Sequence, residues 1–430
     1  MKVIYDISVL GHAHFQTYMR AGIFRVVYEV ARGLNDSKEC DLSFSATALF
    51  KSIDECLVYL ENDSELRDVP LPHPKLRRSF TKKLQSLNNR IDATASPANL
   101  MLRAIRKPLL YADRLIGPDV PIAPEVIEQA DIFHSTYHAI PQQAADARDL
   151  NKFLTVYDLI PILYPQYCKD GLDSFAKNIL HSAGPEDNFI CISNATRDDL
   201  CNYKHDVVPS RVFVAYPAAS DLFYPCLEPE RISQVRQKYG IPDAPYLLSL
   251  STLEPRKNIP QTIRSFARLI HEQHIDDLNL VLVGTQGWKY EEIFETLSNC
   301  KPARSRIILT GYVPDEDLAP LYSGALAFVY PSFYEGFGLP PLEAMQCGTP
   351  VITSNNSSFP EVVGEAGIML DPTDEDNLCQ SMLALYQSQS LRKELSLKSL
   401  KQAEKFTWEK CVEATITAYK TVLGQSTQTA

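Results

Sequence analysis

Short apolar runs alternate along the chain with longer stretches of helical pattern. The runs are rich in branched aliphatic and aromatic residues and are nearly continuous, without regular apolar–polar alternation. Such runs are typical of parallel strands buried on both faces of a sheet, with helices as the connections. We predict strands at Val3–Ile7, Phe153–Tyr157, Phe189–Ile192, Val212–Ala215, Tyr246–Ser251, Leu278–Val283, Arg306–Leu309, Leu326–Tyr330 and Val351–Thr353.

The pattern occurs twice, with a break between about residues 216 and 245. The break contains YPAASDLFYPCLEPE, which is rich in proline and has no regular period, as expected of a linker. The chain's 430 residues also exceed what one ordinary core holds. We therefore predict an α/β protein with two Rossmann-like domains, 1–220 and 221–405. The first has an irregular insertion at about 60–125, and a C-terminal helix lies within 406–430.

Composition and charge narrow the classes of partner. The net charge of −11 argues against nucleic-acid binding, which needs a basic surface. An acidic protein that binds an anionic substrate must concentrate positive charge locally. Ten cysteines occur singly from Cys40 to Cys411, without a CxxC pair, which favours reduced thiols in the cytoplasm and no zinc site. The start, MKVIYDISVLG, is typical of a buried strand and lacks the apolar core of a signal peptide.

One segment of the first half is basic. Residues 75–115 hold ten Lys or Arg against two Asp, with apolar residues at helical spacing. A basic amphipathic helix can lie on an anionic membrane surface. The same pattern also fits a solvated helix whose apolar side packs on its own domain. Both interpretations stay open, and the first predicts peripheral contact with the inner membrane face.

The strongest motif is YEGFGLPPLEAMQCG, at Tyr334–Gly348, between the apolar runs ALAFVYPS and TPVIT. Gly336 and Gly338 allow the backbone to turn tightly and to approach a ligand closely. Pro340 and Pro341 stand where a helix can begin, since proline is tolerated in the first turn. The N-terminus of that helix points free N–H groups at the loop, which favours phosphate binding.

Two acids belong to the same motif. Glu335 precedes the turn, and Glu343 is predicted in the first helical turn, eight residues later. At this spacing both carboxylates can face one pocket. Taken singly, Glu343 can also complement the helix dipole, and Glu335 can be a surface loop residue. The combination of strand, glycines, prolines and acids favours a ligand site.

A second motif, SLSTLEPRKN, ends the strand Tyr246–Ser251. Ligands of α/β folds bind at the carboxyl ends of strands. Arg256 and Lys257 supply the local positive charge that an acidic protein needs there, and they suit a diphosphate leaving group. Two fixed cations can stabilise this charge without a metal, so no metal cofactor is predicted. The alternative is a solvated pair opening a surface helix.

The segments EGFGLPPLE, which has the form Glu-x7-Glu, and EPRKN together resemble the retaining glycosyltransferases of family 4, which have the GT-B fold. The resemblance covers nearly the whole chain and is strongest over 246–375. It implies that Glu335 lies near the transferred sugar and that Glu343 binds the ribose of a nucleotide sugar. It also implies diphosphate contacts from the backbone amides of Phe337, Gly338 and Leu339.

The resemblance also implies contacts outside these two motifs. In LTGYV, Tyr312 and Val313 are candidates for backbone contacts to the nucleobase. In RAGIFR, Gly22 takes the place of a glycine-rich loop over the donor phosphates, and Arg20 is a candidate phosphate or acceptor contact. This loop has one glycine where relatives have two or three, so Gly22 can also simply begin a helix.

The first domain departs from the family at one point. Relatives often have His-Asp where this chain has Tyr157–Asp158, in TVYDLIP. The expected histidine near the sugar is then His138 or His134, both in DIFHSTYHAIP, with His138 favoured. Asp158 is an alternative contact to the sugar or acceptor. In SNATRDD, Ser193 is predicted to be a helix N-cap.

These motifs predict a retaining, metal-independent glycosyltransferase. It would move a hexose from a GDP- or UDP-sugar to a hydroxyl of a glycan or lipid-linked acceptor in cell-surface polysaccharide synthesis. Two alternatives remain at this point. One is a nucleotide-sugar epimerase or phosphorylase of the same fold, although nothing marks a lysine for pyridoxal phosphate. The other is a non-catalytic nucleotide-binding subunit.

Overall fold

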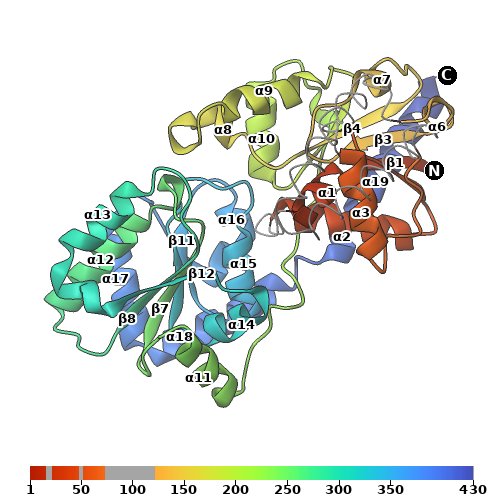
Figure 1. The fold of residues 1–430 in the computed structure, drawn as a ribbon. Helices are drawn as coiled ribbons and strands as arrows, with labels where there is room; N and C mark the ends of the chain where they lie inside the picture. Colours follow the sequence, from red (N-terminus) through yellow and green to blue (C-terminus); the bar gives the residue numbers. More distant parts are fainter. Residues whose placement is uncertain (16–21, 48–51, 73–121, 430) are drawn as a thin grey trace, which may run out of the picture.

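The structure, a computed structural model, describes residues 1–15, 22–47, 52–72 and 122–429. Arg20 and the basic segment 75–115 lie outside these residues. The chain forms two parallel sheets in separate lobes (Figure 1). The predicted α/β class is therefore confirmed, and each lobe is Rossmann-like because helices connect the parallel strands of its sheet.

The first sheet has the strand order β2-β1-β3-β4-β5-β6, and all its strand pairs are parallel. Its strands are β1 Lys2–Asp6, β2 Asp41–Ser45, β3 Ile132–Ser135, β4 Asn151–Val156, β5 Asn188–Cys191 and β6 Val212–Val214. Its helices are α1 Ser8–Phe15, α2 Ile23–Asp36, α3 Ser52–Asn62, α6 Pro124–Ile127, α7 Gln142–Ala145, α8 Ile160–Leu163, α9 Leu172–His181 and α10 Asn194–Tyr203.

The second sheet has the order β12-β11-β10-β7-β8-β9 and is also parallel throughout. Its strands are β7 Tyr246–Leu250, β8 Asn279–Val283, β9 Ile307–Gly311, β10 Ala327–Tyr330, β11 Val351–Ser354 and β12 Gly367–Leu370. Its helices are α11 Pro229–Lys238, α12 Ile259–Glu272, α13 Glu291–Asn299, α14 Asp315–Ser323, α15 Leu339–Gln346, α16 Phe359–Val362, α17 Glu375–Gln387 and α18 Gln389–Ala403. The chain order reverses between β7 and β10, which makes this pair the switch point of the sheet.

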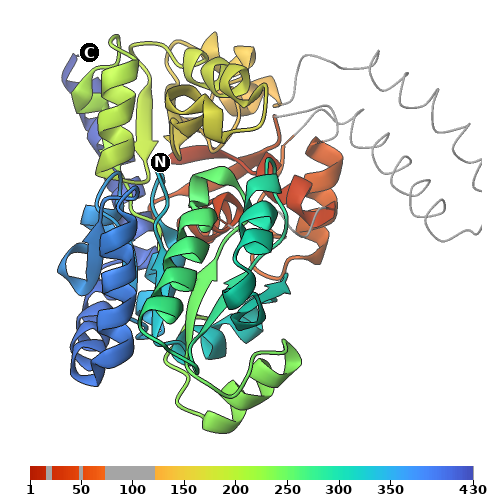
Figure 2. The same cartoon turned by 90° about the vertical axis from the view of Figure 1, so that its left-hand side faces the viewer.

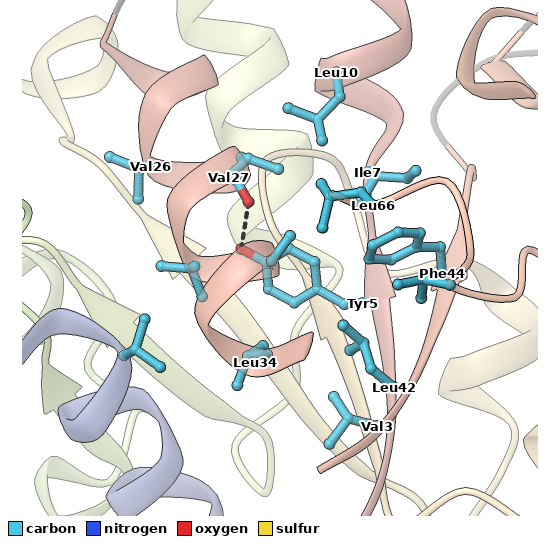
Figure 3. Packing of buried hydrophobic residues seen from close by; sticks show 14 of the residues in the cluster. Val3, Tyr5, Ile7, Leu10, Val26, Val27, Leu34, Leu42, Phe44 and Leu66 are labelled. Atoms are coloured by element: carbon cyan, nitrogen blue, oxygen red, sulfur yellow. Dashed lines mark hydrogen bonds between the residues drawn. The ribbon is translucent and has the colours of Figure 1, made fainter. Parts of the chain in front are cut away.

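The core of the first lobe forms where α2 packs on β1. Val27 and Leu34 on one side of the helix are fully buried, and they face Tyr5 of β1 (Figure 3). The Tyr5 hydroxyl donates a hydrogen bond of 3.4 Å to the backbone carbonyl of Val27. The buried phenol therefore keeps a partner for its only donor, as burial of a polar group requires.

The last helix, α19 Trp408–Thr429, leaves the second lobe and packs on the first. Cys411, Val412 and Tyr419 of α19 belong to the same buried cluster as Val3 of β1. The C-terminal end accordingly lies beside the first sheet in both views (Figures 1 and 2). The two lobes are thus joined by two crossings of the chain, near residues 215–228 and 404–408.

The nine predicted strands are all present, with ends shifted by a residue or two. Three further strands, β2, β3 and β12, are not among the nine. β3 is a short buried strand that includes His134, and β2 and β12 are edge strands with partly exposed faces. The predicted break at 216–245 is wrong in one respect, since it contains α11. Only Val235 of this helix is buried, so its polar sequence gives little periodic signal.

All ten cysteines are free thiols. Within the described ranges, no helix is both long and apolar enough to cross a membrane.

Candidate active site

The two motifs meet at the switch point of the second sheet. Strand β7 ends at Leu250 and leads to the turn Pro255–Lys257, while β10 ends at Tyr330 and leads to Glu335. Because β7 and β10 are neighbours and parallel, their carboxyl ends lie at the same edge. Motifs separated by about 80 positions are thereby brought together, as predicted.

Glu335 is buried and paired with two cations. Its Oε1 lies 2.7 Å from Lys257 Nζ, and its Oε2 lies 2.5 Å from Arg256 Nη1. Arg256 also pairs with Glu254, at 2.8 Å from Nη2 to Oε1. The cluster therefore has two cations and two carboxylates, and each charge has a partner. Burial of this kind is tolerated only with such pairing.

The protonation of the cluster follows from the same contacts. Burial raises the pKa of Glu335, but Arg256 and Lys257 outweigh it and lower this pKa to about 2. Burial and the neighbouring Arg256 lower the pKa of Lys257. Burial alone would lower the pKa of Arg256, but Glu335 and Glu254 raise it. At neutral pH, Glu335 is consequently an ionised carboxylate.

Two hydroxyl groups complete the surroundings of Glu335. Tyr330 and Ser332 donate to its Oε1 at 3.0 and 2.8 Å, and Lys257 also donates to the Tyr330 hydroxyl at 2.7 Å. Sequence analysis did not single out Glu254, Tyr330 or Ser332. The available signal was their position, because Tyr330 ends β10, Ser332 lies two residues later, and Glu254 directly precedes the turn that carries the cations.

The glycine loop presents backbone donors beside this carboxylate. Gly338 has φ 106° and is the residue before α15, so the loop turns sharply into the helix. In the part of the chain that the structure describes, the amides of Phe337, Gly338 and Leu339 donate to no protein acceptor. These are the donors expected to meet a diphosphate, at the positive end of an eight-residue helix.

Gly336 brings this loop against the first domain. A Cβ on Gly336 would lie 2.1 Å from the carbonyl oxygen of Tyr157 and 3.0 Å from Cβ of Asp158. Ser193 donates to the Gly336 carbonyl at 2.6 Å and also accepts from the Thr196 amide as the N-cap of α10. The predicted cap is confirmed, and the same hydroxyl tethers the two domains.

Glu343 contacts a different set of residues from Glu335. It is the fifth residue of α15, so its predicted place in the first turn is wrong. Tyr322 donates to its Oε2 at 3.1 Å, and Arg25 donates to its Oε1 at 2.9 Å. Arg25 belongs to α2 of the first domain and also forms an ion pair with Asp315. Sequence analysis missed Arg25, although it lies three residues after Gly22 in RAGIFR.

Asp158 lies two residues beyond the end of β4, on the side of the first domain that faces the cluster. Its Oδ1 accepts from the Ile160 amide at 2.9 Å. Burial raises its pKa, with an opposing effect of Arg256 and a further rise from Glu335, so the three groups interact electrostatically. A cavity of about 160 Å³ lies beside Asp158, and its walls include Tyr137, Tyr157, Phe175 and Ile179.

The two histidines have different surroundings. His134 is buried, with Nδ1 2.6 Å from the Tyr419 hydroxyl and Nε2 2.7 Å from the Thr155 hydroxyl. Burial lowers its pKa to about 3. Because protein hydroxyls bond to both ring nitrogens, His134 has no nitrogen left for a sugar hydroxyl.

His138 follows β3 and is mostly buried. Among the described residues, its Nδ1 has no hydrogen-bond partner. Burial lowers its pKa; Asp6 acts to raise this pKa and His12 to lower it. A neutral ring with a free nitrogen can contact a sugar hydroxyl, so His138 remains the candidate.

The remaining candidates lie around the helix and strand ends. Gly22 has φ 52° and is the N-cap of α2, so it begins a helix, with open space around the position of a Cβ. The Tyr312 side chain is exposed, and Val313 is buried in the core of the second lobe. A contact of either residue with a base would therefore use the backbone. Among the described residues, no group of three or more His, Cys, Asp or Glu can hold a metal ion.

Two Rossmann-like parallel α/β lobes, with the motif residues at the switch point of the second, are the architecture of the GT-B class of glycosyltransferases. The family described as glycosyl transferases group 1 matches residues 232–402. The chain is 35% identical to the O-antigen chain mannosyltransferase B of Escherichia coli, over 80% of this chain and 88% of that protein. This chain belongs to the group 1 glycosyl transferases, which are of the family 4 type with the GT-B fold, as predicted.

Two further similarities concern a second mannosyltransferase and the fold. A GDP-mannose-dependent phosphatidylinositol monomannoside mannosyltransferase of Mycolicibacterium smegmatis is 31% identical, over 36% of this chain and 42% of that protein. The crystal structure of HepE from Anabaena, in complex with UDP and glucose, has a TM-score of 0.62 at 15% identity, covering all of both chains. The similarity to HepE shows the fold of this chain.

Proposed function

We propose that the protein is a retaining mannosyltransferase that moves mannose from GDP-mannose to an acceptor hydroxyl in the synthesis of a surface polysaccharide. The observation that carries this proposal is the ionised Glu335, held by Arg256 and Lys257 in the loop that also contains three amides without a partner among the described residues. The names of the two mannosyltransferase relatives support mannose, and one of them supports GDP as the carrier.

The donor's diphosphate would lie over the start of α15. The amides of Phe337, Gly338 and Leu339 would donate to its oxygens, while Arg256 and Lys257 would neutralise the charge that develops as the sugar bond breaks. Arg256 offers a fork and Lys257 a point charge. This arrangement supplies by protein groups the stabilisation that a metal can supply elsewhere, so we propose that no metal is needed.

The nucleoside would lie on the other side of α15. Glu343 would accept hydrogen bonds from the ribose, and the backbone at Tyr312 and Val313 would line the base. Gly22 would approach the phosphates from the first domain, with Arg20 as a further candidate outside the described residues.

The acceptor would enter from the first domain. Asp158 would contact its attacking hydroxyl, and the cavity beside Asp158 has aromatic walls that suit the apolar face of a sugar ring. His138 would contact a hydroxyl of the transferred mannose. The attack takes place on the face from which the diphosphate leaves, so the anomeric configuration is retained. Glu335 faces the reacting carbon and stabilises positive charge there.

We also propose a cytoplasmic location, which the ten free thiols support. For the basic segment 75–115 we retain the prediction, made from its sequence, of peripheral contact with anionic membranes. Co-sedimentation of the protein with anionic and with neutral liposomes tests this: equal binding to both contradicts it.

The test of the proposed function is turnover of GDP-mannose with a mannose-containing glycan acceptor. We expect the wild type to transfer mannose and Glu335→Gln to lose at least a hundredfold in kcat, as for removal of a group that stabilises developing charge. Glu394→Gln, which breaks an exposed pair with Lys398, is the matched control and keeps wild-type activity.

Analysis of the reaction products distinguishes a transferase from the alternative functions. An altered nucleotide sugar without an acceptor product indicates an epimerase. Binding of GDP without turnover of any donor indicates a non-catalytic subunit. A thermal-shift series with GDP, UDP and ADP identifies the base, because a selective ligand stabilises the folded state in proportion to ln(1 + [L]/Kd).

A further inference from the structure

Arg25 occupies an unusual position for a residue of the first domain. It extends from the start of α2 across to α14 and α15 of the second domain, and its side chain is 15% exposed. Nη1 donates to Glu343 at 2.9 Å, and Nη2 pairs with Asp315. The guanidinium also lies 5.4 Å from the ring centre of Phe223. Three contacts from the second domain therefore fix one side chain of the first.

Glu343 depends on this contact for its charge. It is buried, and it is surrounded by Arg25 from α2, by Asp315 and Tyr322 from α14, and by Cys347 beyond the end of its own helix. Arg25 is the cation in this set. A buried carboxylate without a cation or several hydrogen bonds takes up a proton instead.

We propose that Arg25 is a positioning residue of the donor site, which fixes the carboxylate of Glu343 as an acceptor for the ribose hydroxyls of the nucleotide. This inference rests on the proposed function, because it takes Glu343 as the ribose contact. The donor site is then completed by the first domain, even though the donor motifs lie in the second.

The hydrogen-bonding capacity of the Glu343 carboxylate suffices for both partners. Arg25 uses one lone pair of Oε1, and Tyr322 uses one of Oε2. An ionised carboxylate accepts about four hydrogen bonds, so about two positions remain for a vicinal diol. Arg25 and ribose therefore bind Glu343 together, and ribose does not have to displace the guanidinium.

The protonation of Glu343 gives the proposal a measurable signature. Burial raises the pKa of Glu343, and Arg25 opposes this rise. Without Arg25, the pKa rises further, and the protonated acid accepts fewer hydrogen bonds from ribose. On acidification, donor affinity would then weaken at a higher pH in the variant than in the wild type.

The test is calorimetric titration of the full-length protein with GDP and with 2′-deoxy-GDP between pH 6 and 8. We expect Arg25→Gln to weaken GDP binding about tenfold or more and to reduce the preference for GDP over 2′-deoxy-GDP to that of Glu343→Gln. We also expect its loss of affinity on acidification to begin at a higher pH than in the wild type. Arg25→Lys keeps the charge without the fork and recovers part of the loss. Arg32→Gln, on the same helix and paired with Glu29, is the control and binds GDP as the wild type does.

The outcomes separate this inference from the proposed function. If the wild type binds neither GDP nor UDP, the proposed function fails. If Glu343→Gln weakens GDP binding and Arg25→Gln binds as tightly as the wild type or more tightly, only the role of Arg25 is overturned. If Arg25→Gln does not fold, Arg25→Lys decides: an unchanged preference for ribose together with an unchanged pH profile overturns the proposal.

Discussion

The backbone of Gly336 lies against the backbone of Tyr157, so closely that a Cβ at position 336 would come 2.1 Å from the Tyr157 carbonyl oxygen. The backbone fixes the position of a Cβ, and the carbonyl oxygen belongs to the main chain, so neither can move aside by changing a rotamer. The glycine loop of the second domain therefore reaches its place beside Asp158 only because residue 336 has no side chain.

Gly336→Ala should separate these two segments and misplace the donor loop relative to the first domain. A displacement of about 1 Å in a catalytic arrangement can cost on the order of a hundredfold in rate. We expect kcat to fall by about this factor, with thermal stability close to that of the wild type. Gly424→Ala, at a position with open space in α19, should keep full activity. Equal activity of the two variants contradicts the prediction.

The ion cluster around Glu335 should govern acid stability. The pKa of Glu335 is about 2 in the folded protein and 4.5 ordinarily. Because the folded value is the lower one, the stabilisation is present above pH 4.5 and is lost as the pH falls from 4.5 to about 2. Glu335→Gln lacks this carboxylate, so its Tm should fall less steeply over that range.

Scanning fluorimetry between pH 2 and 7 measures this difference. At neutral pH the variant should also be less stable than the wild type, since it leaves Arg256 and Lys257 without their shared counter-charge. Glu394→Gln should reproduce the wild-type profile. Parallel curves for Glu335→Gln and the wild type would sink the prediction.

His134 should also make the stability depend on pH, in this case because the folded state buries the neutral form of a base. Burial holds its pKa at about 3, below the ordinary 6.5. The unfolded chain takes up this proton first, so the folded state loses stability as the pH falls from 6.5 towards 3. His134→Gln should flatten the dependence of Tm on pH in this window. His205→Gln, at an exposed position, serves as the control and should leave the slope unchanged.

The same variant tests whether His134 contacts the sugar. With both ring nitrogens bonded to protein, we expect kcat/KM of correctly folded His134→Gln to stay near the wild-type value. A large loss of activity without a change in the pH dependence of Tm would restore His134 as a sugar contact and contradict the structural role.

The packing of α19 on α2 makes a compensating pair testable. A Cβ on Gly33 of α2 would lie 2.3 Å from Cγ2 of Val412. Gly33→Ala alone should therefore destabilise the protein, although alanine favours the helix by about 1 kcal/mol. In the Val412→Ala background the same change should become neutral or stabilising. Chemical denaturation of the four proteins gives the coupling energy, and additive effects would refute direct contact.

The donor half of the site could be predicted because its residues follow the ends of neighbouring strands. Arg256 and Lys257 after β7, and Glu335 after β10, are each marked by an apolar run and a local motif. Parallel pairing then brings the motifs together without further information. The edge strands β2 and β12 gave no such signal, since their partly exposed faces dilute the apolar pattern.

The contacts between domains could not be predicted in this way. Arg25 and Glu343 are 318 positions apart, and His134 and Tyr419 are 285 apart. No local pattern distinguishes His134 from His138, because both lie at or near the end of one strand. Their difference comes from Tyr419, which packs on His134 from a helix at the other end of the chain. Such choices depend on tertiary packing.

The return of α19 to the first lobe also sets an order for biosynthesis. The first sheet emerges from the ribosome early, but its buried cluster includes Val412 and Tyr419. That lobe therefore remains incomplete until α19 has been translated, while the second lobe already has all its strands. A nascent or truncated chain without α19 thus has a folded second lobe beside a first lobe whose core lacks one of its helices.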